Sequence, residues 1–277
     1  MKNIIITDMD ATFISADDYS FDDSIDAYKR AKENQIPVCF CTSKSFPEIE
    51  FFSDILKNRD PFISENGSAV YVPKDYFSFK LKKYNWKKEY KIRNIKEIED
   101  YDIIELNVPH EETYNTLKKI QDRLYFEIKI YTDHTPKELN EYMNIPIDMA
   151  RRSLKKYYAD GCRIPDLTKE KLSAFIKKAK EYGFDTKVGG FFIGINKGCD
   201  KGKATEILLE LMEAEYTKIF SLGVGDSPND FPMLKVCNDS FLVQRQDGSY
   251  ASEKFSHAKG IGPKGWSYAV IKFLKDI

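Results

Sequence analysis

The sequence has no surplus of charge of one sign, because 43 Lys and Arg stand against 44 Asp and Glu in 277 residues. Non-specific binding to nucleic acid or to an anionic membrane requires an excess of cations. No apolar run is long enough to span a bilayer, and the first apolar run is too short and too soon broken by acids to be a signal peptide. We therefore expect no nucleic-acid partner, no membrane partner and a cytoplasmic location.

Cysteine and histidine are also scarce, with five and three residues. The cysteines are scattered and no histidine lies near them, which argues against a zinc site and for a reduced protein. What the chain does have is hydrophobic residues, at 42%, enough to bury the core of one or two domains.

Strand and helix signals alternate at the start of the chain. The first segment, Lys2 to Thr7, is a short β-branched run that ends at acids, as in a strand buried on both faces. Further elements are expected in order as a helix from Asp22 or Asp23, a strand over 38–41, a helix over 49–56 and a strand beginning at 61–64. This rhythm predicts an α/β fold with a doubly wound parallel sheet.

The rhythm weakens after about Tyr84, where the chain becomes rich in Lys, Glu and Tyr. We predict strands over 103–108 and 125–131 and helices over 111–123 and 136–158 in this part. The α/β pattern then resumes with a helix over 203–215, strands over 219–224 and 241–243, and a helix over 266–274. The expected division is a core of residues 1–83 and 191–277 and an inserted α+β cap of residues 84–190.

Polar residues follow three predicted strands and precede one predicted helix. Ligands of parallel sheets bind beyond the carboxyl ends of the strands, so these residues are expected to converge. They are Asp8, Asp10 and Thr12 after the first strand, Thr42, Ser43 and Lys44 after the second, Asp226, Asn229 and Asp230 after the strand over 219–224, and Lys201 before the helix that leads to it.

This set suits the hydrolysis of a phosphomonoester. Asp8 and Asp226 can share Mg²⁺, which offsets the repulsion between a carboxylate and a phosphate dianion. Asp8 can then attack phosphorus and form an aspartyl phosphate, while Asp10 protonates the leaving oxygen and later deprotonates water. Thr42 and Lys201 can stabilise charge on the phosphoryl oxygens.

The same residues also have interpretations that involve no catalysis. Two acids after a strand often only cap the next turn. A calcium loop beginning at Asp8 requires Gly and Glu where the chain has Phe13 and Tyr19, so it is excluded. Lys197 rivals Lys201 as the catalytic lysine, but Lys201 is followed by Gly202 and a helix start.

Together, Asp8-x-Asp10-x-Thr12, Thr42, Lys201 and Gly225-Asp226-x-x-Asn229-Asp230 resemble the four motifs of the haloacid dehalogenase superfamily. The insertion resembles the cap of its Cof-like branch. The segments 41–45, 61–67 and 262–266 are similar to signatures of the mannosyl-3-phosphoglycerate phosphatases. The resemblance implies a magnesium site of Asp8, Asp10, Asp226 and Asp230, and substrate-binding residues Thr12, Ser43, Lys44, Glu65, Asn66 and Asn229.

Two departures from that pattern bear on function. The family usually has Gly where this chain has Ala11, and Ala is strained if the position requires a positive φ. The subfamily also commonly has an Arg-Phe pair after a double glycine, where this chain reads Phe191-Phe192. A cap arginine suits a substrate carboxylate. Arg151, Arg152 and Arg163 are the candidates here, with cap loops near Phe191 and Arg163 expected to govern specificity.

The expected function is a magnesium-dependent phosphomonoester hydrolase for a small phosphorylated sugar or sugar acid. Mannosyl-3-phosphoglycerate is the first candidate substrate, followed by other hexose or glycerate phosphates. Two alternatives remain: a catalytically impaired sugar-phosphate-binding protein, in which Ala11 disables the chemistry, and transfer of the phosphoryl group to a second sugar. The sequence leaves the oligomeric state open.

Overall fold

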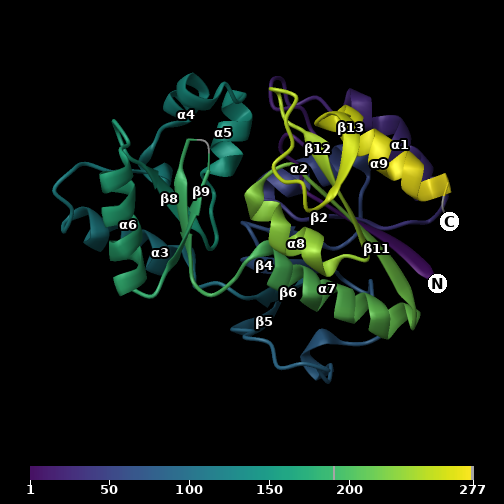
Figure 1. Cartoon of the computed structure of the whole chain (residues 1–277). Coiled ribbons are helices and arrows are strands. Elements are labelled where there is room, and N and C mark those ends of the chain that lie inside the picture. The colour runs from purple at the N-terminus through teal and green to yellow at the C-terminus, as the bar shows by residue number, and fades with distance from the viewer. Residues whose placement is uncertain (190, 276–277) are drawn as a thin grey trace.

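A five-stranded parallel sheet forms the centre of the larger lobe in the computed structural model, which describes residues 1–189 and 191–275 (Figure 1). Its strand order is β13-β12-β11-β1-β2, and every neighbouring pair is parallel. The strands are β1 (Lys2–Thr7), β2 (Val38–Phe40), β11 (Ile219–Gly225), β12 (Asp239–Gln244) and β13 (Ser256–Ile261). The predicted fold class is confirmed.

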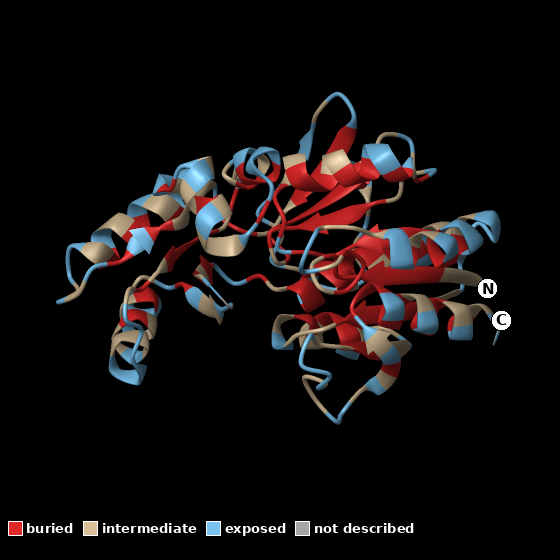
Figure 2. Ribbon diagram, turned by 90° about the horizontal axis from the view of Figure 1, so that it is seen from above, coloured by how far each residue is buried: buried red, intermediate tan, exposed pale blue. Residues whose placement is uncertain are grey.

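Helices cover both faces of this sheet, which explains why β1 is apolar throughout its middle. Ile5 packs in one cluster with residues of α1 and α9, whereas Ile4 and Ile6 pack in another with residues of α7 and α8. The central strands β1, β2 and β11 are mostly buried, and Figure 2 shows such residues in red at the centre of the molecule. The helices of this lobe are α1 (Asp22–Glu33), α2 (Phe46–Leu56), α7 (Lys201–Tyr216), α8 (Phe231–Val236) and α9 (Pro263–Lys275).

A second sheet continues from the end of β2 through a bridge between Cys41 and Ile63. It is antiparallel, with the order β3-β4-β6-β5. Its strands are β3 (Phe62–Ser64), β4 (Ala69–Pro73), β5 (Asn94–Glu97) and β6 (Tyr101–Glu105). β3 and β6 correspond to predicted strands, whereas β4 and β5 were not predicted.

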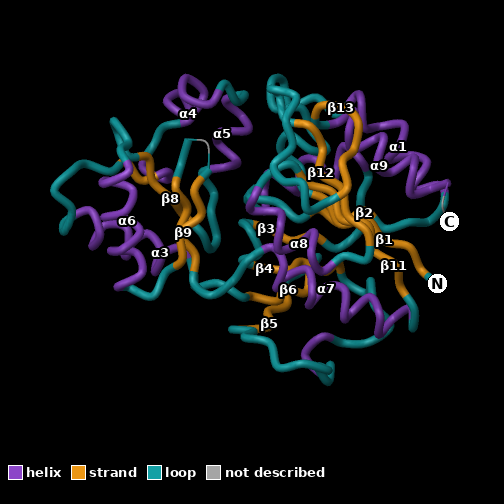
Figure 3. Tube along the Cα trace, viewed as in Figure 1, coloured by secondary structure: helices purple, strands orange, loops and turns teal. Residues whose placement is uncertain are grey.

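The elements from α3 to β10 form a smaller lobe, which we call the cap lobe (residues 110–189 and 191–196). Its antiparallel sheet has the order β7-β8-β10-β9, and Figure 3 shows these strands as a group separate from the core sheets. Leu117 of α3 and Phe175 of α6 are fully buried with Ile193 and Ile195 of β10. The elements are α3 (His110–Gln121), β7 (Lys129–Ile130), α4 (Pro136–Met143), α5 (Ile147–Ser153), β8 (Asp160–Arg163), α6 (Lys169–Glu181), β9 (Asp185–Val188) and β10 (Ile193–Asn196).

The long helix predicted over 136–158 is wrong. The chain forms α4 and α5 instead, because Asn144 adopts the left-handed conformation at φ +53° and ends α4. Pro146, which has no N–H to donate, precedes the first residue of α5. The strand predicted over 125–131 is likewise reduced to β7.

The predicted division into core and cap remains a prediction, but strand pairing bears on its limits. β5 and β6 fall in the range expected for the cap, yet β6 pairs with β4 of the core range. β10 falls in the range expected for the core, yet it pairs with β8 and β9. We propose that the insertion runs from about Asn107 to Asn196; the predicted limit at residue 190 lies outside the described residues, as do residues 276–277. No helix within the described part is long and apolar enough to cross a membrane.

Candidate active site

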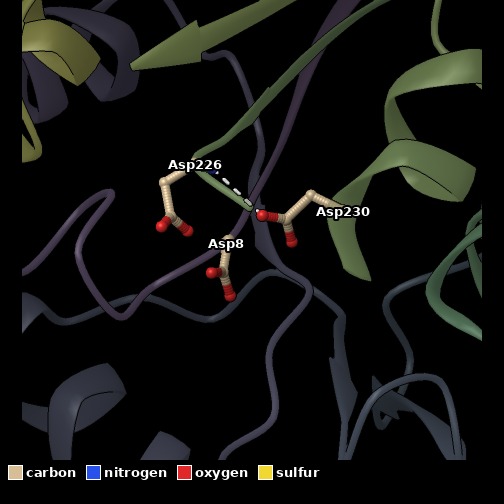
Figure 4. A group of neighbouring side chains, drawn as sticks. All are labelled: Asp8, Asp226 and Asp230. Carbon is tan, nitrogen blue, oxygen red and sulfur yellow. Dashed lines mark hydrogen bonds between the residues drawn. The ribbon is translucent and has the colours of Figure 1, made fainter. Parts of the chain in front are cut away.

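Three aspartates meet where β1 and β11 end. These strands are parallel neighbours with Thr7 opposite Val224, so Asp8 and Asp226 emerge at the same edge of the sheet. Asp230 comes from the short turn that follows β11, and one carboxylate oxygen from each of the three lies within 4.8 Å of the others (Figure 4). Gly225 permits this approach, because a Cβ there would lie 2.6 Å from the Cβ of Asp230.

Lys201 neutralises part of this cluster. It is the first residue of α7, and its Nζ donates to Oδ1 of Asp8 at 2.7 Å and to Oδ1 of Asp230 at 2.6 Å. Its side chain is 1% exposed. The rival Lys197 lies elsewhere, where its ammonium pairs with Glu112 at 3.0 Å. The structure therefore places Lys201, and not Lys197, beside Asp8.

One lysine does not balance three carboxylates. Burial, followed by the charge of Asp230, raises the pKa of Asp8 to about 7, although Lys201 acts in the opposite direction. Burial and the charges of Asp230 and Asp8 raise the pKa of Asp226 to about 8. Such a concentration of negative charge and oxygen donors is the environment that hard divalent cations prefer.

The two oxygens of Asp230 have different partners. Oδ1 accepts from Lys201, while Oδ2 accepts the backbone N–H groups of Asp226 and Ser227, each at 3.0 Å. Asp230 is thus fixed in place and also holds the loop that carries Asp226. Asp8 and Asp226 are less constrained, since Lys201 bonds only Oδ1 of Asp8 and Thr12 donates to Asp226 over 3.5 Å. The residues present fit a divalent cation shared by Asp8 and Asp226.

Asp10 stands apart from these three residues. Its side chain is 42% exposed, and its Oδ1 pairs with Nζ of Lys44 at 2.8 Å. Lys44 is itself buried and also contacts Glu48 at 3.4 Å, on α2. The ion pair orients Asp10 at the cavity wall. Metal binding by Asp10 remains a prediction.

The other predicted residues surround this centre. Thr42 is fully buried, and its Oγ1 accepts the backbone N–H of Lys44 at 3.2 Å. Nδ2 of Asn229 donates to Oδ1 of Asn66 at 3.2 Å. The predicted residues that line the cavity are Asp8, Asp10, Ser43, Lys44, Glu65, Asn66, Asp226 and Asn229. Thr12, Thr42, Lys201 and Asp230 lie behind this wall.

The cavity itself measures about 600 Å³ and lies between the core and the cap lobe. Its cap wall is largely apolar, with Tyr131, Met143, Ile145, Val188, Phe191 and Phe192. Cationic side chains also line the cavity: Lys156 and Lys187 from the cap lobe and Arg245 from the core. The site therefore combines an acidic centre at the ends of β1 and β11 with a partly cationic lining.

None of the three cap arginines proposed from the sequence lines this cavity. Arg151 pairs with Asp148 at 2.7 Å, whereas Arg152 and Arg163 each stack on an aromatic ring at 4.6 Å. Arg245 was missed, and its Nε donates to the backbone oxygen of Asp226 at 3.4 Å. It directly follows β12, so the rule that ligands bind beyond strand ends would have identified it.

Ala11 adopts a left-handed conformation at φ +54°, the condition under which strain was expected. We predict that Ala11→Gly raises the free energy of unfolding by about 1 kcal/mol, because glycine has no Cβ to oppose this conformation. Urea denaturation measures the change. Lys57→Gly is the matched control, since Lys57 has φ +51° at the end of α2, away from the cavity. A loss of stability in Ala11→Gly beside a gain in Lys57→Gly would contradict the prediction.

Comparison with known proteins shows which family this chain resembles in sequence and in fold. The sequence profile of the haloacid dehalogenase-like hydrolases matches residues 5–249. A glucosyl-3-phosphoglycerate/mannosyl-3-phosphoglycerate phosphatase of Methanococcoides burtonii is 34% identical over 278 residues, 99% of this chain and 98% of its own. A protein of the same name from Persephonella marina is 32% identical over 279 residues, again 99% and 98%. A crystal structure from Thermoplasma acidophilum, 18% identical, covers 100% of this chain and 98% of its own with a TM-score of 0.65.

Proposed function

Because the chain belongs to the haloacid dehalogenase-like hydrolase family, we propose that it is a Mg²⁺-dependent phosphatase that acts through an aspartyl phosphate on Asp8. The observation that carries this proposal is the setting of Asp8. Its carboxylate is buried, Lys201 bonds one of its oxygens, and Asp226 lies beside it as a second oxygen ligand. A side chain held in this way has one oxygen left to attack phosphorus.

The proposed reaction has two steps, and Asp8 and Asp10 take part in both. The free oxygen of Asp8 forms a bond to phosphorus while the bond from phosphorus to the leaving oxygen breaks. Asp10 gives its proton to that oxygen, so the product leaves as an alcohol. Asp10 then takes a proton from water, whose oxygen attacks phosphorus, releases inorganic phosphate and restores the Asp8 carboxylate. Asp8 and Asp226 would hold Mg²⁺, which would supply positive charge that offsets the repulsion between the carboxylate and the phosphate dianion.

Three further residues assist without exchanging protons. Lys201 keeps Asp8 oriented and places a buried positive charge beside the phosphoryl site. Thr42 supports the backbone of Lys44 from behind the cavity wall, and its bond to a phosphoryl oxygen remains a prediction. Lys44 holds Asp10 against the cavity wall through their 2.8 Å ion pair.

We propose a small phosphorylated sugar or sugar acid as substrate, with mannosyl-3-phosphoglycerate first and its glucosyl analogue next. Two relatives that match nearly the whole chain are named for these compounds. The volume of about 600 Å³ falls in the range of roughly 300–1,000 Å³ usual for small-molecule sites. Lys156, Lys187 and Arg245 supply the positive charge that a glycerate carboxylate requires. We also propose that the protein is cytoplasmic and that its partner is a small molecule.

Phosphate release from a panel of sugar and glycerate phosphates tests the proposal. We predict release with Mg²⁺ that EDTA reduces by at least about a hundredfold, because the carboxylate cluster then repels the substrate dianion. The same assay separates the alternatives. Ligand-induced thermal stabilisation without release would favour the binding protein, and a phosphorylated acceptor in place of free phosphate would favour transfer to a second sugar. Either result would overturn hydrolysis as the function.

A further inference from the structure

Three consecutive residues after β3 have positive φ. Glu65 and Asn66 have φ +47° and +59°, and Gly67 has φ +91°. Non-glycine residues rarely occupy this region, and strained backbone of this kind persists only where surrounding contacts enforce it. We call residues 65–67 the strained turn.

One side of the strained turn faces the acidic centre of Asp8, Asp226 and Asp230. A Cβ on Gly67 would lie 2.1 Å from the backbone oxygen of Asp200, so the turn lies directly against the start of α7 and Lys201. The side-chain oxygen of Asn66 accepts from Asn229, in the loop that carries Asp226. The turn is therefore tied to two of the elements that hold Asp8 and its partners.

The other side of the turn is bonded to the cap lobe. Oε1 of Glu65 accepts the backbone N–H of Tyr157 at 2.9 Å, and Oε2 accepts those of Tyr158 at 3.1 Å and Ala159 at 2.8 Å. Glu65 is 1% exposed. Burial raises the pKa of its carboxyl, although Lys156 and the three N–H groups act in the opposite direction. Bonds to a charged acceptor in such a place are among the stronger hydrogen bonds.

The segment bonded by Glu65 also forms part of the cavity. Lys156, Ala159, Asp160 and Gly161 line the space above the acidic centre. The same stretch meets the loop after β2, where Ser45 donates to the backbone oxygen of Arg152 at 3.0 Å and Lys156 to that of Ser43 at 3.4 Å. Glu65 contributes three of the bonds across this junction, although its oxygens were expected to bind substrate.

We propose that Glu65 is a positioning residue that holds the cap segment 157–161 over the acidic centre. Through Glu65 this segment, which forms part of the cap wall, is coupled to Lys201 and Asn229. A substrate whose leaving group fills the cavity depends on this wall. A small ester, whose leaving group does not reach it, depends mainly on the acidic centre. Glu65 therefore affects the two kinds of substrate differently, through the cap segment that it holds.

The kinetic test, which rests on the proposed hydrolase function, compares mannosyl-3-phosphoglycerate with phenyl phosphate in the Glu65→Gln variant. Glutamine keeps the length of the side chain but replaces one acceptor oxygen with a donor that opposes a backbone N–H. We expect kcat/KM for the sugar substrate to fall at least about tenfold more than for the small ester, mainly through KM. Equal losses for both substrates would show that Glu65 acts on the acidic centre itself and would overturn the proposal.

Asp60→Asn is the control for an acid that bonds the backbone, since the Asp60 side chain is only 10% exposed. Its Oδ2 accepts the N–H of Val38 at 2.7 Å and pairs with Lys32 at 2.6 Å, and it does not line the cavity. We expect this variant to lose stability while leaving the ratio between the two substrates unchanged. A shift in the ratio as large as that of Glu65→Gln would mean that lowered stability alone changes selectivity, which contradicts the proposed role.

Hydrogen exchange provides a test that needs no substrate or turnover. In the native protein the amides of Tyr157, Tyr158 and Ala159 should exchange slowly, because each donates to Glu65. In Glu65→Gln we expect exchange there to be at least about tenfold faster, with the rates in Asp60→Asn unchanged. Unaltered protection in a folded Glu65→Gln protein would overturn the proposal. If the wild type released no phosphate from any compound, the hydrolase function would fail while this result still decided the role of Glu65.

Discussion

Asp8→Asn is expected to lower phosphate release at least about a thousandfold, because the amide oxygen does not replace a carboxylate as nucleophile. The substitution changes almost no volume, so the fold should be kept. It also removes one negative charge from a buried cluster in which the pKa of Asp8 is already raised to about 7. We therefore expect stability in urea to be equal to or greater than that of the wild type.

Asp17→Asn provides the control for this prediction. Asp17 is exposed, and its carboxylate accepts a hydrogen bond from Gln246 outside the aspartate cluster. Its replacement should leave phosphate release within about twofold of the wild type. An Asp8→Asn protein that retained a tenth of the wild-type rate would remove Asp8 from the role of nucleophile.

Gly67→Ala is expected to lower the free energy of unfolding by about 3–5 kcal/mol, a cost typical of forced overpacking combined with an unfavourable backbone. The new Cβ would meet the backbone oxygen of Asp200 at 2.1 Å and the backbone nitrogen of Lys201 at 2.8 Å. Neither atom can move without displacing the start of α7. Phosphate release should fall as well, because Lys201 orients Asp8.

Gly248→Ala separates the steric effect from the backbone effect. Gly248 also has a positive φ, +78°, but nothing lies within 4 Å of a Cβ built on it. We expect this control to cost about 1 kcal/mol, the strain of the backbone alone. Equal costs for the two variants in urea denaturation would show that the strained turn does not press against α7.

The core of the site was predictable because its aspartates directly follow buried parallel strands. A β-branched run that ends at acids indicates a buried parallel strand, and the ends of such strands converge. That reasoning places Asp8 beside Asp226 from the sequence alone. The separation of Asp10 from the carboxylate cluster was not predictable in this way, because it depends on the ion pair with Lys44, a residue on a different loop.

The cap lobe was less predictable because its structure depends on weak signals and distant contacts. Two short helices replaced one long one because Asn144 took a left-handed conformation, which asparagine only sometimes does. β5 was missed because its four residues are mostly polar and exposed. The bonds from Glu65 join residues more than ninety positions apart, and no local pattern around Glu65 or Tyr157 indicates them.

The measurement that tests the central claim most directly is rapid acid quenching of the enzyme during turnover of a radiolabelled phosphate ester, followed by identification of the labelled peptide. Our account predicts that the label is bound covalently to Asp8, that it appears before free phosphate and that it is absent from Asp8→Asn. Release of phosphate without any covalent label, or with the label on another residue, would contradict the proposal that Asp8 is the nucleophile.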